Sequence, residues 1–173
     1  MQVPLAALTS PLRATLIGAD ATIDRVITDS RLARPGDLFV PLVAERDGHD
    51  FVAAALAAGA TAALSERGTD DLGLDHDARL LLVAHTGAAL NDLARLARDR
   101  MSARVTGVTG SAAKTTVKDL MAGVLGAHLV TSASERSFNN EIGVPLTLCN
   151  APDDVEALVV EMGARGPGHI AAL

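Results

Sequence analysis

The segment Lys114-Thr115-Thr116 carries the side chains best suited to chemistry on phosphate groups. It follows residues 107–113, a run rich in small residues, as in the phosphate-binding loop G-x-x-x-x-G-K-[ST]. In such a loop backbone N–H groups surround an anion, the lysine reaches the terminal phosphates and the hydroxyl group holds Mg²⁺. We therefore predict a nucleotide site here, in which Lys114 is the catalytic cation.

The predicted site departs from the pattern at one position, because Ala113 stands where a glycine belongs before the lysine. If this position takes a left-handed backbone conformation, alanine costs roughly 1–2 kcal/mol there. Its methyl group would also crowd a bound phosphate, which is why glycine suits such loops. The alternative is a turn that only joins a strand to a helix. The predicted members of the site are Gly107, as the first glycine of the pattern, with Gly110, Ser111, Ala112, Ala113, Lys114, Thr115 and Thr116.

Lysine is rare in this chain, since only Lys114 and Lys118 are lysines among its 15 basic residues. A lysine presents a compact charge, whereas arginine presents a broad planar fork. The bias toward arginine therefore indicates that lysine is kept for places where a compact charge is needed.

An acidic residue, Glu161, follows the apolar run 155–160. Such a run is typical of a parallel strand that is covered on both faces. Ligands bind at the carboxyl ends of parallel strands, so Glu161 and the loop should share one edge of a sheet. We predict that Thr115 and Glu161 hold Mg²⁺, although Glu161 could equally be a solvated acid. We interpret Asn139-Asn140 first as turn residues. The alternative is that a buried amide oxygen of this pair lies beside the phosphates and supports the metal.

Strand and helix patterns alternate along the chain, which predicts an α/β fold. Residues 86–100 show the clearest helical stripe, with apolar residues at 90, 93, 94 and 97, and Gly59 is expected to cap a helix over 50–58. We expect a domain boundary near 101–103. The other predicted elements are strands 22–28, 38–43, 60–64, 79–84, 104–109, 128–132 and 155–161, and helices 114–126 and 141–149.

Composition excludes several classes of protein. A net charge of −6 and the absence of tryptophan and tyrosine argue against nucleic acid as a partner. No window approaches the ~20 apolar residues of a membrane span, and no signal peptide is recognisable, so we expect a cytoplasmic protein. The single cysteine, Cys149, excludes an internal disulfide and is predicted to lie in the core. The oligomeric state is not readable from the sequence.

Three segments resemble the ATP-dependent Mur ligases of peptidoglycan synthesis. The last two are specific, and they look like the branch of the family that adds D-alanyl-D-alanine. Together the segments extend the resemblance over essentially the whole chain. They are 28–51, with Thr28-Asp-Ser-Arg31, Pro35-Gly-Asp-Leu-Phe39 and Asp47-Gly-His-Asp-Phe51; 107–119; and the pair Ser137-Phe-Asn-Asn-Glu-Ile-Gly-Val-Pro-Leu-Thr-Leu148 and Val160-Glu-Met-Gly-Ala-Arg-Gly-Pro-Gly-His-Ile170.

This resemblance implies a small α/β domain over 1–102 that binds the UDP-linked substrate. It also implies that 103–173 begin a parallel-sheet domain of the P-loop type that binds ATP, left incomplete at Leu173. The implied reaction is phosphorylation of the terminal carboxylate of UDP-N-acetylmuramoyl-tripeptide by ATP, followed by attack of the amine of D-alanyl-D-alanine. The resemblance places Ser30, Arg31, Asp47 and His49 near the uridine diphosphate, and it adds Asn140 to the nucleotide site beside Mg²⁺.

Two departures from the family limit what can be transferred. Ala113 replaces the loop glycine, and a full ligase continues for hundreds of residues beyond Leu173, including the domain that binds the dipeptide. We therefore expect no ligase activity from residues 1–173 alone. The alternatives are a UDP-sugar-binding module with a degenerate phosphate loop, another Mur ligase, or a truncated chain without independent function.

Overall fold

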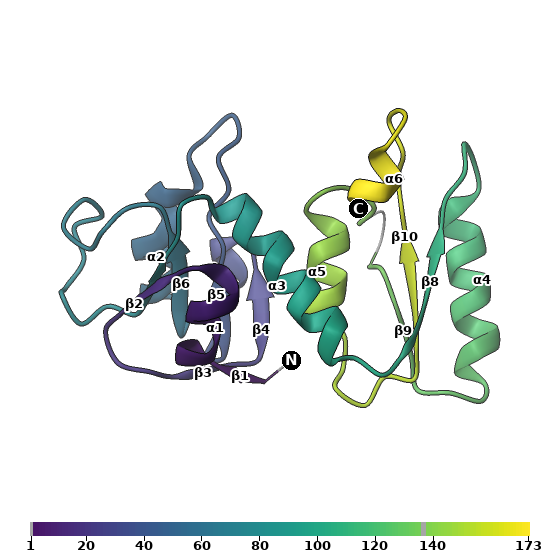
Figure 1. The fold of residues 1–173 in the computed structure, drawn as a ribbon, viewed down its shortest axis with the longest axis horizontal. Coiled ribbons are helices and arrows are strands. Elements are labelled where there is room, and N and C mark those ends of the chain that lie inside the picture. The colour runs from purple at the N-terminus through teal and green to yellow at the C-terminus, as the bar shows by residue number, and fades with distance from the viewer. Residues whose placement is uncertain (1, 136–137) are drawn as a thin grey trace. The chain divides into compact units, whose positions relative to one another are not determined.

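The structure is a computed structural model that describes residues 2–135 and 138–173. The chain divides into two compact units, Met1–Leu93 and Ala94–Leu173. Each unit combines a sheet with helices, so the predicted α/β class is confirmed (Figure 1). The border between the units falls inside helix α3, Thr86–Arg100. The boundary at residue 102 that the family resemblance implies stays a prediction.

The second unit is built on three parallel strands in the order β8-β10-β9. Their bounds are Arg104–Val108 for β8, Thr131–Ala133 for β9 and Ala157–Glu161 for β10. All five residues of the central strand β10 are buried, as the apolar run predicted. Glu161 pairs with Val108, so the ends of β8 and β10 lie at one edge of the sheet.

Two helices enclose β10. Figure 1 shows α4, Lys114–Gly126, and α5, Gly143–Cys149, on opposite sides of this strand. Leu158 and Val160 of β10 pack in one core cluster with Val144 of α5. The alternate residues of a strand point to the other face, and there Glu161 meets α4. A last short helix, α6, spans His169–Ala172.

The first unit holds a five-stranded mixed sheet in the order β2-β7-β6-β5-β4. Strand β2 is antiparallel to β7, and the other neighbours are parallel. A separate antiparallel pair joins β1 to β3. The bounds are β1 Val3–Pro4, β2 Thr15–Ile17, β3 Thr22–Ile23, β4 Arg25–Ile27, β5 Asp37–Phe39, β6 Ala62–Ser65 and β7 Leu80–Leu82.

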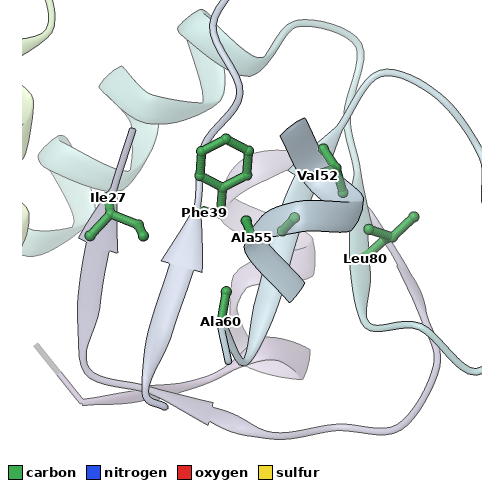
Figure 2. Packing of buried hydrophobic residues seen from close by; sticks show 7 residues of the cluster. Ile27, Phe39, Val52, Ala55, Ala60 and Leu80 are labelled. Atoms are coloured by element: carbon green, nitrogen blue, oxygen red, sulfur yellow. The ribbon is translucent and has the colours of Figure 1, made fainter. Parts of the chain in front are cut away.

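One core cluster of the first unit lies where α2, Val52–Ala57, covers the sheet. Figure 2 shows Phe39 of β5 and Leu80 of β7 packed beside Val52 and Ala55 of this helix. Helix α1 of this unit spans Leu5–Leu12, and short 3₁₀ helices span Ser30–Leu32 and Gly48–Phe51. Among the described residues no helix is long and apolar enough to cross a membrane.

Several elements differ from the sequence predictions. The single strand predicted over 22–28 is wrong, because β3 and β4 pair with different partners, β1 and β5. The strand predicted over 128–132 lies later, as β9. In contrast, α3 and α4 have the predicted bounds, and the predicted cap Gly59 has φ +112°. Helix α1 and strands β1 and β2 were not predicted.

The single cysteine lies in the core of the second unit, as predicted. Cys149 is 1% exposed, and burial raises its pKa from 9.0 to about 12. A neutral buried thiol is a poor nucleophile, because the thiolate is the reactive form. The raised pKa of Cys149 adds to the free energy of unfolding. This contribution is fully present below pH 9 and is lost as the pH rises through about 12.

We expect a disulfide reagent at pH 7.5 to label Cys149 only when the second unit opens. Labelling should therefore be at least about a hundredfold slower than in denaturant. The measurement is the rate of thiol release with Ellman's reagent, with and without guanidinium chloride. Labelling at the same rate in both conditions would contradict the buried position.

Candidate functional site

The predicted loop joins the end of β8 to the start of α4. Ala113, the residue just before the helix, has φ +59° and ψ +10°. This is the left-handed conformation that the sequence analysis considered for it, and it costs an alanine roughly 1–2 kcal/mol. Arg13 is the other described residue besides glycine with positive φ. Ala113 therefore adopts the backbone conformation that the pattern assigns to glycine.

Gly107 was predicted as the first glycine of the pattern, and this placement is wrong. Counted back from Lys114, the first position of the pattern falls on Val108. In the structure Gly107 lies within β8, paired with Val160. A Cβ atom there would lie 2.8 Å from the sulfur of Met162. The glycine thus leaves space for a neighbouring side chain, and the loop itself begins after β8.

The start of α4 offers donors for an anion. No side chain caps this helix, and the N–H groups of its first turn have no acceptor earlier within the helix. The Lys114 ammonium donates to the carbonyl of Gly110 at 2.9 Å, across the loop. Ser111, Ala112 and the other loop residues up to Ala113 are exposed. The helix dipole and the lysine therefore place positive charge at one exposed point.

Glu161 lies at the centre of the site, and it is 1% exposed. Its Oε2 atom accepts a hydrogen bond from the Thr115 hydroxyl at 2.8 Å, which confirms the predicted proximity of the two residues. Its Oε1 atom accepts from the side-chain amide of Asn139 at 2.7 Å. A buried carboxylate is thus held by two neutral donors beside an open helix end. Thr116, the next residue of α4, is exposed.

The arrangement of Thr115 and Glu161 suits Mg²⁺. Two adjacent oxygen ligands, each about 2.0–2.1 Å from the ion in octahedral geometry, lie about 2.9 Å from each other. The hydroxyl and carboxylate oxygens are 2.8 Å apart. Among residues 2–135 and 138–173 no three histidine, cysteine, aspartate or glutamate side chains gather into a metal-binding group. Phosphate and water would therefore supply the remaining ligands, as is usual for Mg²⁺.

The two asparagines of the 139–140 pair have different tasks. Asn139 contacts Glu161, whereas Asn140 accepts from the backbone N–H of Gly143 at 2.9 Å, at the start of α5. The contacts of Asn140 are thus those of a turn residue, as the first interpretation of this pair predicted. A role for Asn140 beside the metal stays a prediction, and the asparagine that reaches the carboxylate is Asn139. Ser137, which begins the motif quoted for this segment, lies outside the described residues.

A second polar cluster behind Glu161 was not predicted. Lys118 is 3% exposed, and its ammonium donates to the carbonyl of Ser134 at 2.7 Å. It also lies 2.9 Å from the carboxylate of Asp119. The hydroxyl of Ser134 accepts from the backbone N–H of Glu161 at 3.0 Å. The scarcity of lysine singled out Lys118, but no pattern pointed to Ser134 as its partner.

In the first unit, Ser30 and Arg31 lie in the 3₁₀ helix Ser30–Leu32. The Arg31 side chain is 85% exposed and forms three hydrogen bonds to Asp29, Nε to Oδ1 at 2.9 Å, Nε to Oδ2 at 3.2 Å and Nη2 to Oδ2 at 2.7 Å. These bonds lower the pKa of the Asp29 carboxyl. In this structure the guanidinium is exposed, and its Nε and Nη2 atoms are bonded to Asp29.

Asp47 and His49 form one network with Glu66 and Arg67. The Nε2 atom of His49 accepts from the backbone N–H of Glu66 at 3.0 Å, so the ring proton must be on Nδ1. That Nδ1–H donates to Asp47 at 2.7 Å, and Arg67 donates to the other oxygen of Asp47. The pKa of Asp47 is lowered, first by the backbone N–H of His49 and then by its ring. His49 is 2% exposed, so it shapes this turn from inside.

Comparison with known proteins identifies relatives over nearly the whole chain. The family model for the Mur ligase middle domain matches residues 108–173. The chain is 42% identical over 172 residues to UDP-N-acetylmuramoyl-tripeptide--D-alanyl-D-alanine ligase of Escherichia coli (strain K12), which covers 99% of the chain and 37% of that ligase. It is 40% identical over 163 residues to the ligase of the same name from Synechocystis sp. (strain ATCC 27184 / PCC 6803 / Kazusa), which covers 94% and 36%.

Solved structures show the same relationship. The UDP-N-acetylmuramoylalanyl-D-glutamyl-2,6-diaminopimelate--D-alanyl-D-alanyl ligase of Acinetobacter baumannii matches with a TM-score of 0.85 and 30% identity, over 98% of the chain and 38% of that protein. MurF ligase of Thermotoga maritima, solved in complex with ADP, matches with a TM-score of 0.69 and 38% identity, over 85% and 34%. The chain therefore spans little more than a third of the length of these relatives.

Proposed function

Since the chain belongs to the Mur ligase family, we propose that it is the N-terminal part of an ATP-dependent ligase that joins D-alanyl-D-alanine to UDP-N-acetylmuramoyl-tripeptide. The observation that carries this proposal is the contact between Glu161 and Thr115 beside the open N-terminus of α4. A phosphate-loop hydroxyl and a carboxylate at the end of a neighbouring strand are the usual pair that holds Mg²⁺ on a nucleotide.

The nucleotide would bind at the start of α4. Lys114 would exchange the carbonyl of Gly110 for the terminal phosphates, and the N–H groups of the first turn would bind phosphate oxygens. Thr115 and Glu161 would hold Mg²⁺, which neutralises the charge that develops on the transferred phosphoryl group. The Thermotoga maritima relative was solved in complex with ADP, which supports a nucleotide as a ligand of the proposed ligase.

In the reaction that we propose, the terminal carboxylate of the tripeptide attacks the γ-phosphorus of ATP and ADP leaves. The amine of D-alanyl-D-alanine then attacks the acyl phosphate, loses a proton, and phosphate leaves as the amide forms. Lys114 would stabilise the negative charge of the first transition state. The second step also needs residues that bind the dipeptide, and we assign none of the residues named here to that role.

We propose that the first unit binds the uridine diphosphate portion of the substrate. Arg31 would turn its exposed guanidinium from Asp29 to the diphosphate, and Ser30 would add a hydroxyl group. Asp47 and the buried His49 would fix the turn that borders the ligand. These four assignments rest on the family resemblance, and those of Arg31, Asp47 and His49 also rest on the contacts of their side chains.

Titration calorimetry with residues 1–173 tests this function. We expect UDP-N-acetylmuramoyl-tripeptide and Mg-ATP to bind with separate saturating isotherms, and we expect no phosphate release when D-alanyl-D-alanine is added. Failure of both ligands to bind would refute the proposal. Phosphate release that depends on both substrates would instead refute the inactivity of residues 1–173 alone.

A second candidate function is favoured by Ala113. If its left-handed backbone and its methyl group prevent nucleotide binding, the chain is a UDP-sugar-binding module with a degenerate phosphate loop. The same titration separates the two functions, because this module would bind UDP-N-acetylmuramoyl-tripeptide but not Mg-ATP.

The variant Ala113→Gly tests the alanine directly. Glycine relieves roughly 1–2 kcal/mol of backbone strain in the folded state. It also gives the unfolded chain more entropy, which lowers stability by about 0.4–1 kcal/mol, so the net gain in stability should be about 0.5–1 kcal/mol. The affinity for Mg-ATP should also rise, because the phosphate gains space. Thermal unfolding and calorimetry measure the two effects.

The matched control for this variant is Arg13→Gly. Arg13 is exposed and has φ +51°, so glycine relieves comparable strain at a position that belongs to the first unit and not to the loop. We expect a similar gain in stability with no change in the affinity for Mg-ATP. If both variants change the affinity equally, the effect does not come from the loop.

A further inference from the structure

The ends of β9 and β10 meet in an irregular way. The parallel pairing runs from Ala157 with Thr131 to Val159 with Ala133, and one more step sets Ser134 beside Val160. In a regular ladder Ser134 would donate its N–H to Val159 and accept from Glu161 through its carbonyl. The first bond is present at 2.9 Å. The second is not, because the N–H of Glu161 donates to the Ser134 hydroxyl at 3.0 Å.

Lys118 contacts the Ser134 carbonyl that the Glu161 N–H does not use. Lys118 is 3% exposed, and its ammonium donates to the Ser134 carbonyl at 2.7 Å. A buried ammonium group must be well hydrogen-bonded, since burial without partners is very costly. The hydroxyl of Ser134 replaces the carbonyl that the lysine occupies, so the backbone N–H of Glu161 keeps an acceptor. The Thr147 hydroxyl on α5 lies 3.4 Å from the Ser134 hydroxyl.

The exchange connects the two halves of the candidate metal site. Lys118 lies on α4, one helical turn beyond Lys114, and the same helix carries Thr115. Through Ser134 it contacts the strand end that carries Glu161. We propose that Lys118 and Ser134 are positioning residues, which set the Glu161 carboxylate against Thr115 by moving the Glu161 N–H from a carbonyl to a hydroxyl acceptor. The part of this inference that concerns Mg²⁺ rests on the proposed function.

Hydrogen exchange of the Glu161 amide tests the exchange of acceptors without any ligand. In Ser134→Ala the hydroxyl is lost while Lys118 still occupies the carbonyl, so protection of this amide should fall about tenfold or more. In Lys118→Met the carbonyl becomes available, and protection should be kept. In the double variant the carbonyl replaces the missing hydroxyl, so protection should return to the level of Lys118→Met.

The double variant decides this step. If its Glu161 amide exchanges as fast as that of Ser134→Ala, Lys118 does not compete for the carbonyl and the proposal is overturned. Unchanged protection in Ser134→Ala would overturn it as well. The conservative variant Ser134→Thr retains a hydroxyl and should keep protection, and it separates loss of the hydroxyl from damage to the packing.

The effect on the metal site is measured by nucleotide titration in Mg²⁺ and in EDTA. Lys118→Met and the double variant should weaken Mg-ATP binding about tenfold, because a misplaced ligand loses part of its binding energy, and should leave ATP binding in EDTA unchanged. The matched control Asp119→Asn keeps an oxygen that can accept from Lys118, on a side chain that is exposed, and should change neither affinity.

The outcomes distinguish this inference from the proposed function. If the unchanged protein does not bind Mg-ATP, the proposed function fails, whereas the amide exchange still decides whether Lys118 and Ser134 set the end of β10. If the unchanged protein binds Mg-ATP and Lys118→Met binds it equally well, the proposed function stands and the positioning role is overturned.

Discussion

Replacement of Lys114 by methionine is expected to weaken Mg-ATP binding by roughly 10- to 100-fold, the effect of losing a hydrogen bond from a charged group to phosphate. The fold should be affected little. Lys114 is only half-buried, and its ammonium donates to the carbonyl of Gly110 at 2.9 Å. We therefore expect the free energy of unfolding to change by less than about 1 kcal/mol. Calorimetric titration and thermal unfolding measure the two quantities.

The control for this variant is Arg104→Met. Arg104 is exposed at the start of β8. Its replacement removes one positive charge from the same unit, at the opposite edge of the sheet. A general loss of attraction for an anion would weaken ATP binding in both variants. Loss of a specific phosphate contact would weaken it only in Lys114→Met, and equal affinities in the two variants would remove Lys114 from the site.

The loop and its helix could be predicted from the sequence because their signals are local. Small residues before a lysine and two threonines predict a strand, a turn and a helix in that order, and α4 begins at Lys114 as predicted. Comparison with the glycine of the pattern raised a left-handed conformation of Ala113 as one case, and the structure has it, at φ +59°. The same reading misplaced Gly107 by one position, because a glycine within β8 was counted as part of the loop.

The contact of Glu161 with Thr115 could also be predicted, since parallel strands carry their functional residues at one edge of the sheet. Its other neighbours could not. Asn139 and Asn140 are equally polar and adjacent in the sequence, and only the path of the chain decides that Asn139 reaches Glu161. Ser134 has no motif, because its role depends on which acceptor Lys118 takes.

In the first unit the errors have a tertiary cause. Residues 22–28 have the composition of one strand, but β3 and β4 find different partners within a few residues. At the join, the N–H of Asp24 donates to the carbonyl of Gly36. Local pattern carries no information on a partner that is distant in the sequence, so it cannot place such a break. Helix α3, whose apolar stripe is complete, needed no such information.

The variant Glu161→Gln should remove the effect of Mg²⁺ on ATP binding without unfolding the protein. In the unchanged protein we expect EDTA to weaken ATP binding roughly tenfold or more. EDTA removes the Mg²⁺ ion, and with it the contact between the ion and the charged carboxylate of Glu161. In the variant the affinities in Mg²⁺ and in EDTA should be nearly equal. A neutral amide cannot supply the carboxylate charge that attracts the ion.

The same substitution should leave the folded state almost as stable. The amide oxygen can still accept from Asn139, and the amide N–H₂ can donate to the Thr115 hydroxyl oxygen, so both contacts of the buried side chain have a replacement. We expect a change of less than about 1 kcal/mol in the free energy of unfolding, measured by urea denaturation. A much larger loss would show that the charge itself stabilises the fold.

Glu156→Gln is the matched control, since it neutralises an exposed glutamate just before the start of β10, whose carboxylate accepts from the N–H of Val130. Its ATP binding should keep the full dependence on Mg²⁺. If Glu161→Gln keeps that dependence as well, the metal is held by phosphate and Thr115 alone. The burial of Glu161 would then serve only to tie Asn139 and α4 to the end of β10, and the ligand role proposed for it would have to be abandoned.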